Sequence, residues 1–168
     1  STATIGTFGA AVAASKMLGL DSKQCALAMG IAGTQAAGLK SMFGTMCKPL
    51  HAGKAAQNGL FAAQLAARNF SSRLDILERH QGFAHTQSEA PDIAAGLTGI
   101  GEHFEVCDVL FKYHASCYMT HSTIEAVHQI KEEARIQPSE IEKIKIFVAK
   151  GCCDVCGIPI PETGLEAK

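Results

Sequence analysis

The sequence has no tryptophan, only two tyrosines and no long run of apolar residues. Without about 18 consecutive apolar residues, it offers no candidate for a membrane-spanning helix. It also lacks an excess of charge of one sign, since 15 Lys and Arg residues stand against 16 Asp and Glu residues. That balance argues against a nucleic-acid-binding protein, which normally shows a basic stripe. The start of the chain lacks the basic region and cleavage site of a secretory signal.

The seven cysteines do not indicate a disulfide framework, because their number is odd and their spacing irregular. Reduced thiols in a cytoplasmic protein are the default expectation for such a pattern. Cys153 and Cys156 form a single CxxC pair, whereas a structural zinc site would need two further ligands at similar spacing. Small buried or half-buried thiols are the simpler interpretation, and a zinc module is the last alternative.

What the sequence does contain is alanine, most of it before Phe70. Alanine favours helices and lets their axes approach closely. With 168 residues, 47% of them hydrophobic, the chain is long enough to bury a core. The pattern predicts three helices: one over about 6–18 that stops at Gly19, one that begins after Asp21 or Ser22 and reaches about Ala37, and one over about 52–68.

Beyond Phe70 the pattern becomes mixed. We expect a short helix over 90–97, an extended run over 106–111, a helix opened by a capping box at Ser122–Glu125, a strand over 143–150 with one covered face, and a loop over 151–168. The predicted fold class is mainly α. An alanine-rich helical bundle over 1–111 is followed by the start of a small α/β lid over 112–168. Since one helix and one strand cannot make a stable sheet, we expect a piece of a longer chain.

A first cluster of residues that could bind a ligand is Lys48-Pro-Leu-His51, at the start of the third predicted helix. A helix N-terminus presents free N–H groups and a partial positive charge, and therefore favours carboxylate or phosphate. Lys48 adds a full positive charge. The alternative is an exposed lysine beside a histidine that caps the helix.

A second cluster runs from Lys112 to His121 and includes His114 and Cys117. Cationic and titratable groups at this density suit a site that binds a polyanionic acid and moves a proton. Nucleophilic catalysis by a Cys–His pair is a weaker alternative, because no protease-type signature surrounds Cys117. In a purely structural interpretation, His121 caps the following helix and Cys117 belongs to the core.

At these clusters the sequence resembles the MmgE/PrpD family. The matching stretches are 6–20, 48–56, 112–121 and 161–168, in the family's order. Family members are much longer, so the resemblance covers about the middle third of one. It implies a large all-α domain with a smaller α/β lid, and a cytoplasmic homodimer without metal or organic cofactor. Known activities of the family are 2-methylcitrate dehydration, cis-aconitate decarboxylation and iminodisuccinate epimerisation.

The resemblance also implies roles for individual residues. It carries roles over to Lys48, Lys112, Cys117 and His121. From these and from the two clusters we assign Lys112, Cys117 and His121 to catalysis, and Lys48, His51 and His114 to substrate binding. The family's decarboxylase has an active-site histidine where this sequence has Cys117, which disfavours decarboxylation. Ala115 and His114 depart from the family's usual proline and aromatic residue.

The function that the resemblance implies is dehydration of a small polycarboxylate such as 2-methylcitrate. A proton beside a carboxylate is weakly acidic, so cations must stabilise the charge that builds up as it leaves. Lys48 and Lys112 are expected to bind the substrate's carboxylates from opposite walls of a cleft, with Cys117 and His121 near the proton that moves. The alternatives are an epimerase or isomerase of a dicarboxylate, and a non-catalytic helical oligomerisation module.

Overall fold

The computed structural model describes residues 2–167, which divide into two compact units. Unit 1 comprises the residues up to Met42 together with Met46–Phe104, and unit 2 comprises Phe43–Thr45 and the residues from Glu105 onward. The domain boundary expected between residues 111 and 112 stays a prediction. Among the described residues, no helix combines the length and apolarity needed to cross a bilayer.

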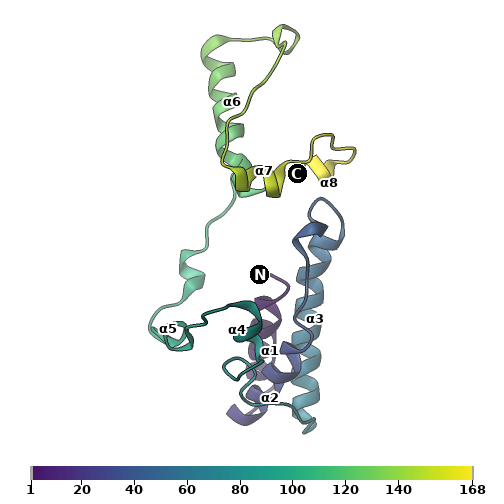
Figure 1. Ribbon diagram of the computed structural model, residues 1–168, viewed down its shortest axis with the longest axis vertical. Coiled ribbons are helices and arrows are strands. Elements are labelled where there is room, and N and C mark those ends of the chain that lie inside the picture. Colours follow the sequence, from purple (N-terminus) through teal and green to yellow (C-terminus); the bar gives the residue numbers. More distant parts are fainter. Residues whose placement is uncertain (1, 168) are drawn as a thin grey trace. The chain divides into compact units, whose positions relative to one another are not determined.

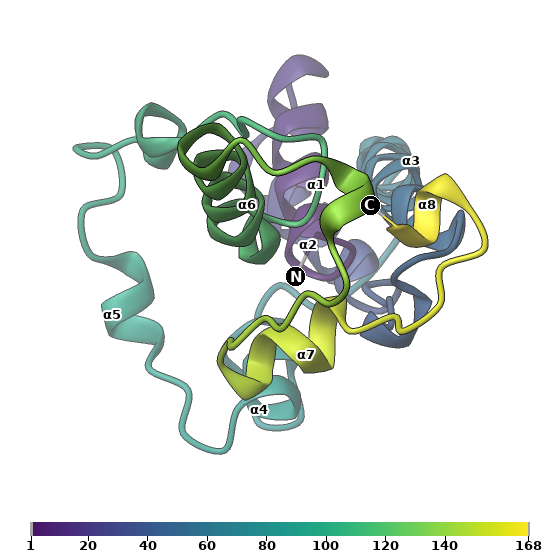
Figure 2. The same ribbon diagram turned by 90° about the horizontal axis from the view of Figure 1, so that it is seen from above.

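Unit 1 is built on three long helices: α1 (Ile5–Met17), α2 (Ser22–Gly33) and α3 (Cys47–Ala67). Each packs against the other two, and they lie side by side in both ribbon views (Figures 1 and 2). Their shared core is made almost entirely of alanine methyl groups, because small side chains let the helices approach closely. Its buried members are Ala11, Ala28, Ile31, Ala32, Ala62, Ala63 and Ala66.

The two loop signals between α1 and α2 act as the sequence predicts. Gly19 adopts a positive φ of 69° after α1, and Leu20 N–H donates to the carbonyl of Ser15 at 3.0 Å, which closes a Schellman motif. Asp21 is the N-cap of α2. Its carboxylate accepts from Gln24 N–H at 2.7 Å, while the Gln24 side chain accepts from Asp21 N–H at 3.2 Å. These bonds satisfy N–H groups that a helix start leaves open.

Replacing Asp21 by alanine should remove this cap and lower the free energy of unfolding by about 1 kcal/mol. Asp21→Asn keeps a side-chain acceptor and is the matched control, with little change expected. Urea denaturation followed by circular dichroism measures both variants. Equal losses in the two would show that the cap contributes nothing.

The third helix begins at Cys47, earlier than predicted, because Pro49 falls in its first turn, where proline's missing N–H costs no hydrogen bond. After α3 the chain folds back across α2. Ser72 Oγ donates to the carbonyl of Leu27 at 2.7 Å, and a methyl group at Gly30 would collide with the carbonyl of Arg73. Close approach of another backbone therefore explains a glycine inside α2.

Two short helices complete unit 1: α4 (Phe83–Gln87) and α5 (Ile93–Leu97). Phe83 contacts Phe8 edge to face, with ring centroids 4.8 Å apart, and this contact attaches α4 to α1. α5 begins after the N-cap Asp92, whose side chain accepts from Ala95 N–H at 2.9 Å. The short helix predicted over 90–97 is therefore present, with a later start.

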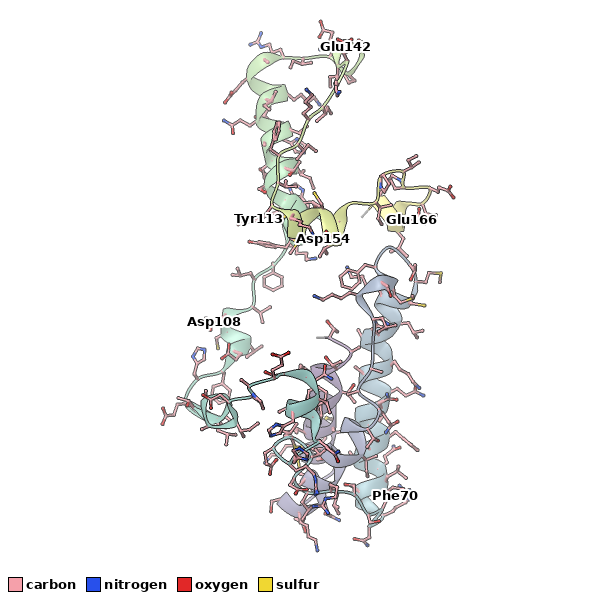
Figure 3. All side chains as sticks on the ribbon, viewed as in Figure 1. Phe70, Asp108, Tyr113, Glu142, Asp154 and Glu166 are labelled. Atoms are coloured by element: carbon pink, nitrogen blue, oxygen red, sulfur yellow. The ribbon has the colours of Figure 1, made fainter. Side chains whose placement is uncertain are left out.

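Unit 2 is organised around α6 (His121–Ala134) and is helical elsewhere only in short pieces. These pieces are η2 (Glu105–Asp108), η3 (Tyr118–Thr120), η4 (Pro138–Glu140), α7 (Lys150–Cys156) and α8 (Gly164–Ala167), while η1 (Lys40–Met42) belongs to unit 1. α7 packs against η3. Figure 3 shows Glu142 at the far end of unit 2 from Tyr113 and Asp154. The prediction of a mainly α protein is confirmed.

The extended elements predicted for unit 2 are wrong for the described residues. The run expected over 106–111 begins as the 3-10 helix η2, and 141–149 has no regular structure although 143–150 was expected to be a strand. Ile144 is 59% exposed and Phe147 is 92% exposed. A strand needs a neighbour to bond its N–H and C=O groups, and none pairs with this segment here. The tail predicted as loop contains α7 and α8 instead.

Candidate functional site

The second cluster forms a hydrogen-bonded loop in front of α6. Lys112 Nζ donates to the carbonyl of Ser116 at 2.8 Å, and Ser116 Oγ lies 2.9 Å from Thr120 Oγ1. Thr120 Oγ1 in turn donates to the carbonyl of Cys117 at 2.7 Å. The contacts run from one end of the loop to the other, so that the ammonium group of Lys112 is attached to the residues that precede α6.

His121, the first residue of α6, is the buried residue of this cluster, with 7% of its surface exposed. Neither ring nitrogen has a hydrogen-bond partner among the described residues, although both atoms are buried. The Tyr118 ring lies beside it, with centroids 4.9 Å apart. Buried polar groups are normally paired, so an unpaired imidazole indicates a place where a polar ligand or another chain segment would supply the partner.

The start of α6 does not use the predicted capping box at Ser122–Glu125. The helix begins at His121 with Thr120 as N-cap, and no side chain caps it. The Thr120 hydroxyl donates backwards, to the Cys117 carbonyl. The Glu125 carboxylate contacts His114. Backbone carbonyls take the place of a side-chain cap, because the His121 N–H donates to the Tyr118 carbonyl of η3. The partial positive charge of the helix start still favours an anion nearby.

His114 is held between three groups of α6. Its Nε2 lies 2.5 Å from Oε1 of Glu125. Its ring stands almost perpendicular to that of His121, with centroids 5.2 Å apart, and stacks parallel to that of His128 at 6.2 Å. The structure thus brings His114 and His121, both predicted as site residues, into direct ring contact.

The other predicted residues lie in unit 1. Lys48 and His51 belong to the first turns of α3, where Lys48 is exposed and His51 is half-buried. A methyl group at Gly38 would lie 3.4 Å from Nδ1 of His51, so the loop before α3 passes close to this ring. The convergence of Lys48 and Lys112 on one substrate stays a prediction.

Two residues that contact His114 were not predicted as site residues from the sequence: Glu125 and His128. Helical spacing carries a signal for both, because they follow His121 by four and seven residues and so share its face of α6. The capping-box pattern gave Glu125 a different expected role, and His128 lies outside the two clusters that the sequence pattern marked.

Comparison with known proteins identifies the family. Residues 1–95 match the model of the MmgE/PrpD N-terminal domain, and residues 114–168 match the model of the MmgE/PrpD C-terminal domain. Among curated proteins, the chain is 32% identical over 150 residues to the cis-aconitate decarboxylase of Homo sapiens, a match that covers 86% of this chain. It is 30% identical to those of Aspergillus terreus and Mus musculus, over 95% and 98% of this chain.

These matches extend over both units but over only part of the relatives. The chain spans 31% of the length of the human protein and 35% of the lengths of the other two. Nearly all of this chain is nevertheless aligned, and the two domain models match it in the expected order. The chain therefore belongs to the MmgE/PrpD family.

Proposed function

We propose that this chain supplies substrate-binding and proton-transfer groups to a lyase that dehydrates a small polycarboxylate such as 2-methylcitrate. The observation that carries the proposal is the imidazole of His121, which is buried and has no hydrogen-bond partner among the described residues. It lies at the start of α6, which no side chain caps. A carboxylate beside His121 would meet the partial positive charge at the start of α6, and the Lys112 ammonium belongs to the loop that leads to it.

The chemistry follows from the charges. Removing the proton next to a carboxylate leaves an electron pair that the carboxylate takes up as enolate charge, which a nearby ammonium group stabilises. We assign that role to Lys112, and to Lys48 on α3. The proton passes to His121 or to the Cys117 thiolate. Loss of hydroxide from the neighbouring carbon, with a proton from an imidazolium, then gives an alkene and water.

Decarboxylation of cis-aconitate is a second candidate, favoured by the names of the three relatives described above. It needs the same recognition of a tricarboxylate, but the bond that breaks is C–C and the product is carbon dioxide. The resemblance disfavours it, because Cys117 stands where the family's decarboxylase has a histidine. The homodimer and the cytoplasmic location implied by the resemblance also stay predictions.

The reaction product separates these possibilities. The purified protein is incubated in deuterated water with 2-methylcitrate, with carboxyl-labelled cis-aconitate and with a chiral dicarboxylate, each separately. The products are followed by proton and carbon NMR. We expect a new alkene signal from 2-methylcitrate and no labelled carbon dioxide from cis-aconitate. Release of carbon dioxide would establish decarboxylation instead. An exchanged sp³ centre in a dicarboxylate would establish an epimerase. Self-association without binding or turnover of any of these acids would support the oligomerisation module.

A further inference from the structure

A carboxylate–imidazole pair lies next to the unpaired histidine of unit 2. It consists of Glu125 on α6 and His114 on the preceding loop, joined at 2.5 Å. The His114 side chain is 25% exposed and the Glu125 side chain is 66% exposed, so the pair is open to solvent on the carboxylate side. The His114 ring also contacts the buried ring of His121.

The contact fixes where His114 carries its proton. An ionised carboxylate can only accept a hydrogen bond, so Nε2 of His114 must be the protonated nitrogen in the contact with Glu125. In the neutral ring Nδ1 then holds the lone pair. Nδ1 has no hydrogen-bond partner among the described side chains and backbone groups, and so remains able to accept a proton.

The contact also fixes the orientation of the ring. His114 stacks parallel to His128, with 5° between the ring planes, while 85° separates its plane from that of His121. Three groups on successive turns of α6 thus hold one imidazole: Glu125 by a charge-assisted hydrogen bond, and the two histidines by ring contact. A histidine that only filled space would need no carboxylate partner.

We propose that Glu125 is a positioning residue that acts through His114. It selects the His114 tautomer with the proton on Nε2 and holds this ring against His121, so that Nδ1 is presented as a proton acceptor beside the buried imidazole. The catalytic part of this proposal rests on the proposed function, whereas the selection of the tautomer does not.

The test compares Glu125→Gln with Glu132→Gln. A glutamine at 125 nearly preserves size but can either accept from Nε2–H or donate to a bare Nε2, so it no longer selects one tautomer. Glu132 is an exposed glutamate of the same helix and provides the matched control. The full chain, labelled with ¹⁵N in its histidines, is examined by two-bond nitrogen–proton correlation NMR, which distinguishes the tautomers of each imidazole.

In the unsubstituted chain we expect His114 mainly as the Nε2–H tautomer. In Glu125→Gln the ratio of the Nε2–H to the Nδ1–H tautomer of His114 should fall about fivefold, the size expected for an exposed charged pair. The chemical shifts of the His121 ring protons should also change, because the His114 ring turns. Glu132→Gln should leave both unchanged. An unchanged His114 tautomer ratio in Glu125→Gln would overturn the proposal. If the salt bridge only stabilised the helix, its loss would lower the free energy of unfolding without changing the tautomer ratio.

Turnover of 2-methylcitrate then tests the proposed function and the catalytic role of Glu125 separately. If Glu125 acts through His114, kcat of Glu125→Gln falls about fivefold while KM changes little. Absence of turnover in the unsubstituted protein would contradict the proposed function, while the tautomer change would still establish the positioning of His114. Normal kcat in Glu125→Gln, in a protein that does turn over the acid, would contradict the catalytic part of the Glu125 proposal alone.

Discussion

Replacing Gly59 by alanine is expected to destabilise unit 1 by about 2 kcal/mol. Gly59 lies on α3 where this helix crosses α1, and a methyl group there would lie 2.6 Å from the backbone nitrogen of Ala11 and would collide with the Ala10 side chain. The helices would have to move apart, and overpacking of this kind costs about 3 kcal/mol. The better helix propensity of alanine offsets about 1 kcal/mol of that loss.

Gly53→Ala is the matched control, because Gly53 lies on the same helix and an added methyl group meets nothing within 4 Å. It should gain up to about 1 kcal/mol from helix propensity alone. Urea unfolding followed by circular dichroism gives both free energies of unfolding. If Gly59→Ala proved as stable as Gly53→Ala, the close crossing of α1 and α3 would be refuted.

The second large effect is a loss of catalytic efficiency when Lys112 is replaced. Lys112→Ala should lower kcat/KM for a tricarboxylate by roughly tenfold or more, the loss expected when one charge-stabilising group is removed from a developing anion. Its ammonium donates to the Ser116 carbonyl within the loop that precedes α6. Because this charge is needed most when the proton leaves, the loss should appear in kcat as well as in KM.

Lys145→Ala is the control for Lys112→Ala. Lys145 is an exposed lysine of unit 2 in the irregular segment 141–149, so its removal changes net charge by the same amount. Steady-state kinetics on 2-methylcitrate, and on cis-aconitate if the protein decarboxylates it, measure both variants. Turnover by Lys112→Ala equal to that by Lys145→Ala would exclude Lys112 from substrate binding and catalysis.

Local sequence signals were sufficient to predict the three long helices of unit 1. The Gly19 stop and the Asp21 cap work over a few residues, and each is satisfied by neighbours in sequence. The same local reasoning failed at 143–150, because alternation of apolar residues shows what a strand would bury but supplies no second strand. It also failed at Ser122–Glu125, where a distant partner, His114, contacts the carboxylate that a capping box would need.

For the site, the sequence pattern located the segment 112–121 but not the contacts within it. The density of titratable groups from Lys112 to His121 marked the loop, and the structure brings His114 and His121 into contact there. The burial of His121 and the pairing of His114 with Glu125 depend on how the loop returns onto α6. No spacing rule for a loop of this kind specifies that return, since loop conformation is set by contacts along its whole length.

By itself the sequence determined the mainly α character, the alanine-based packing of α1, α2 and α3, and the family, because helix propensity, caps and motif order are properties of neighbouring residues. Only the tertiary structure decided that His121 is buried without a partner and that Glu125 contacts His114. Burial and long-range hydrogen bonds depend on which surfaces meet in space, and that is fixed only when the loop before α6 packs onto the helix.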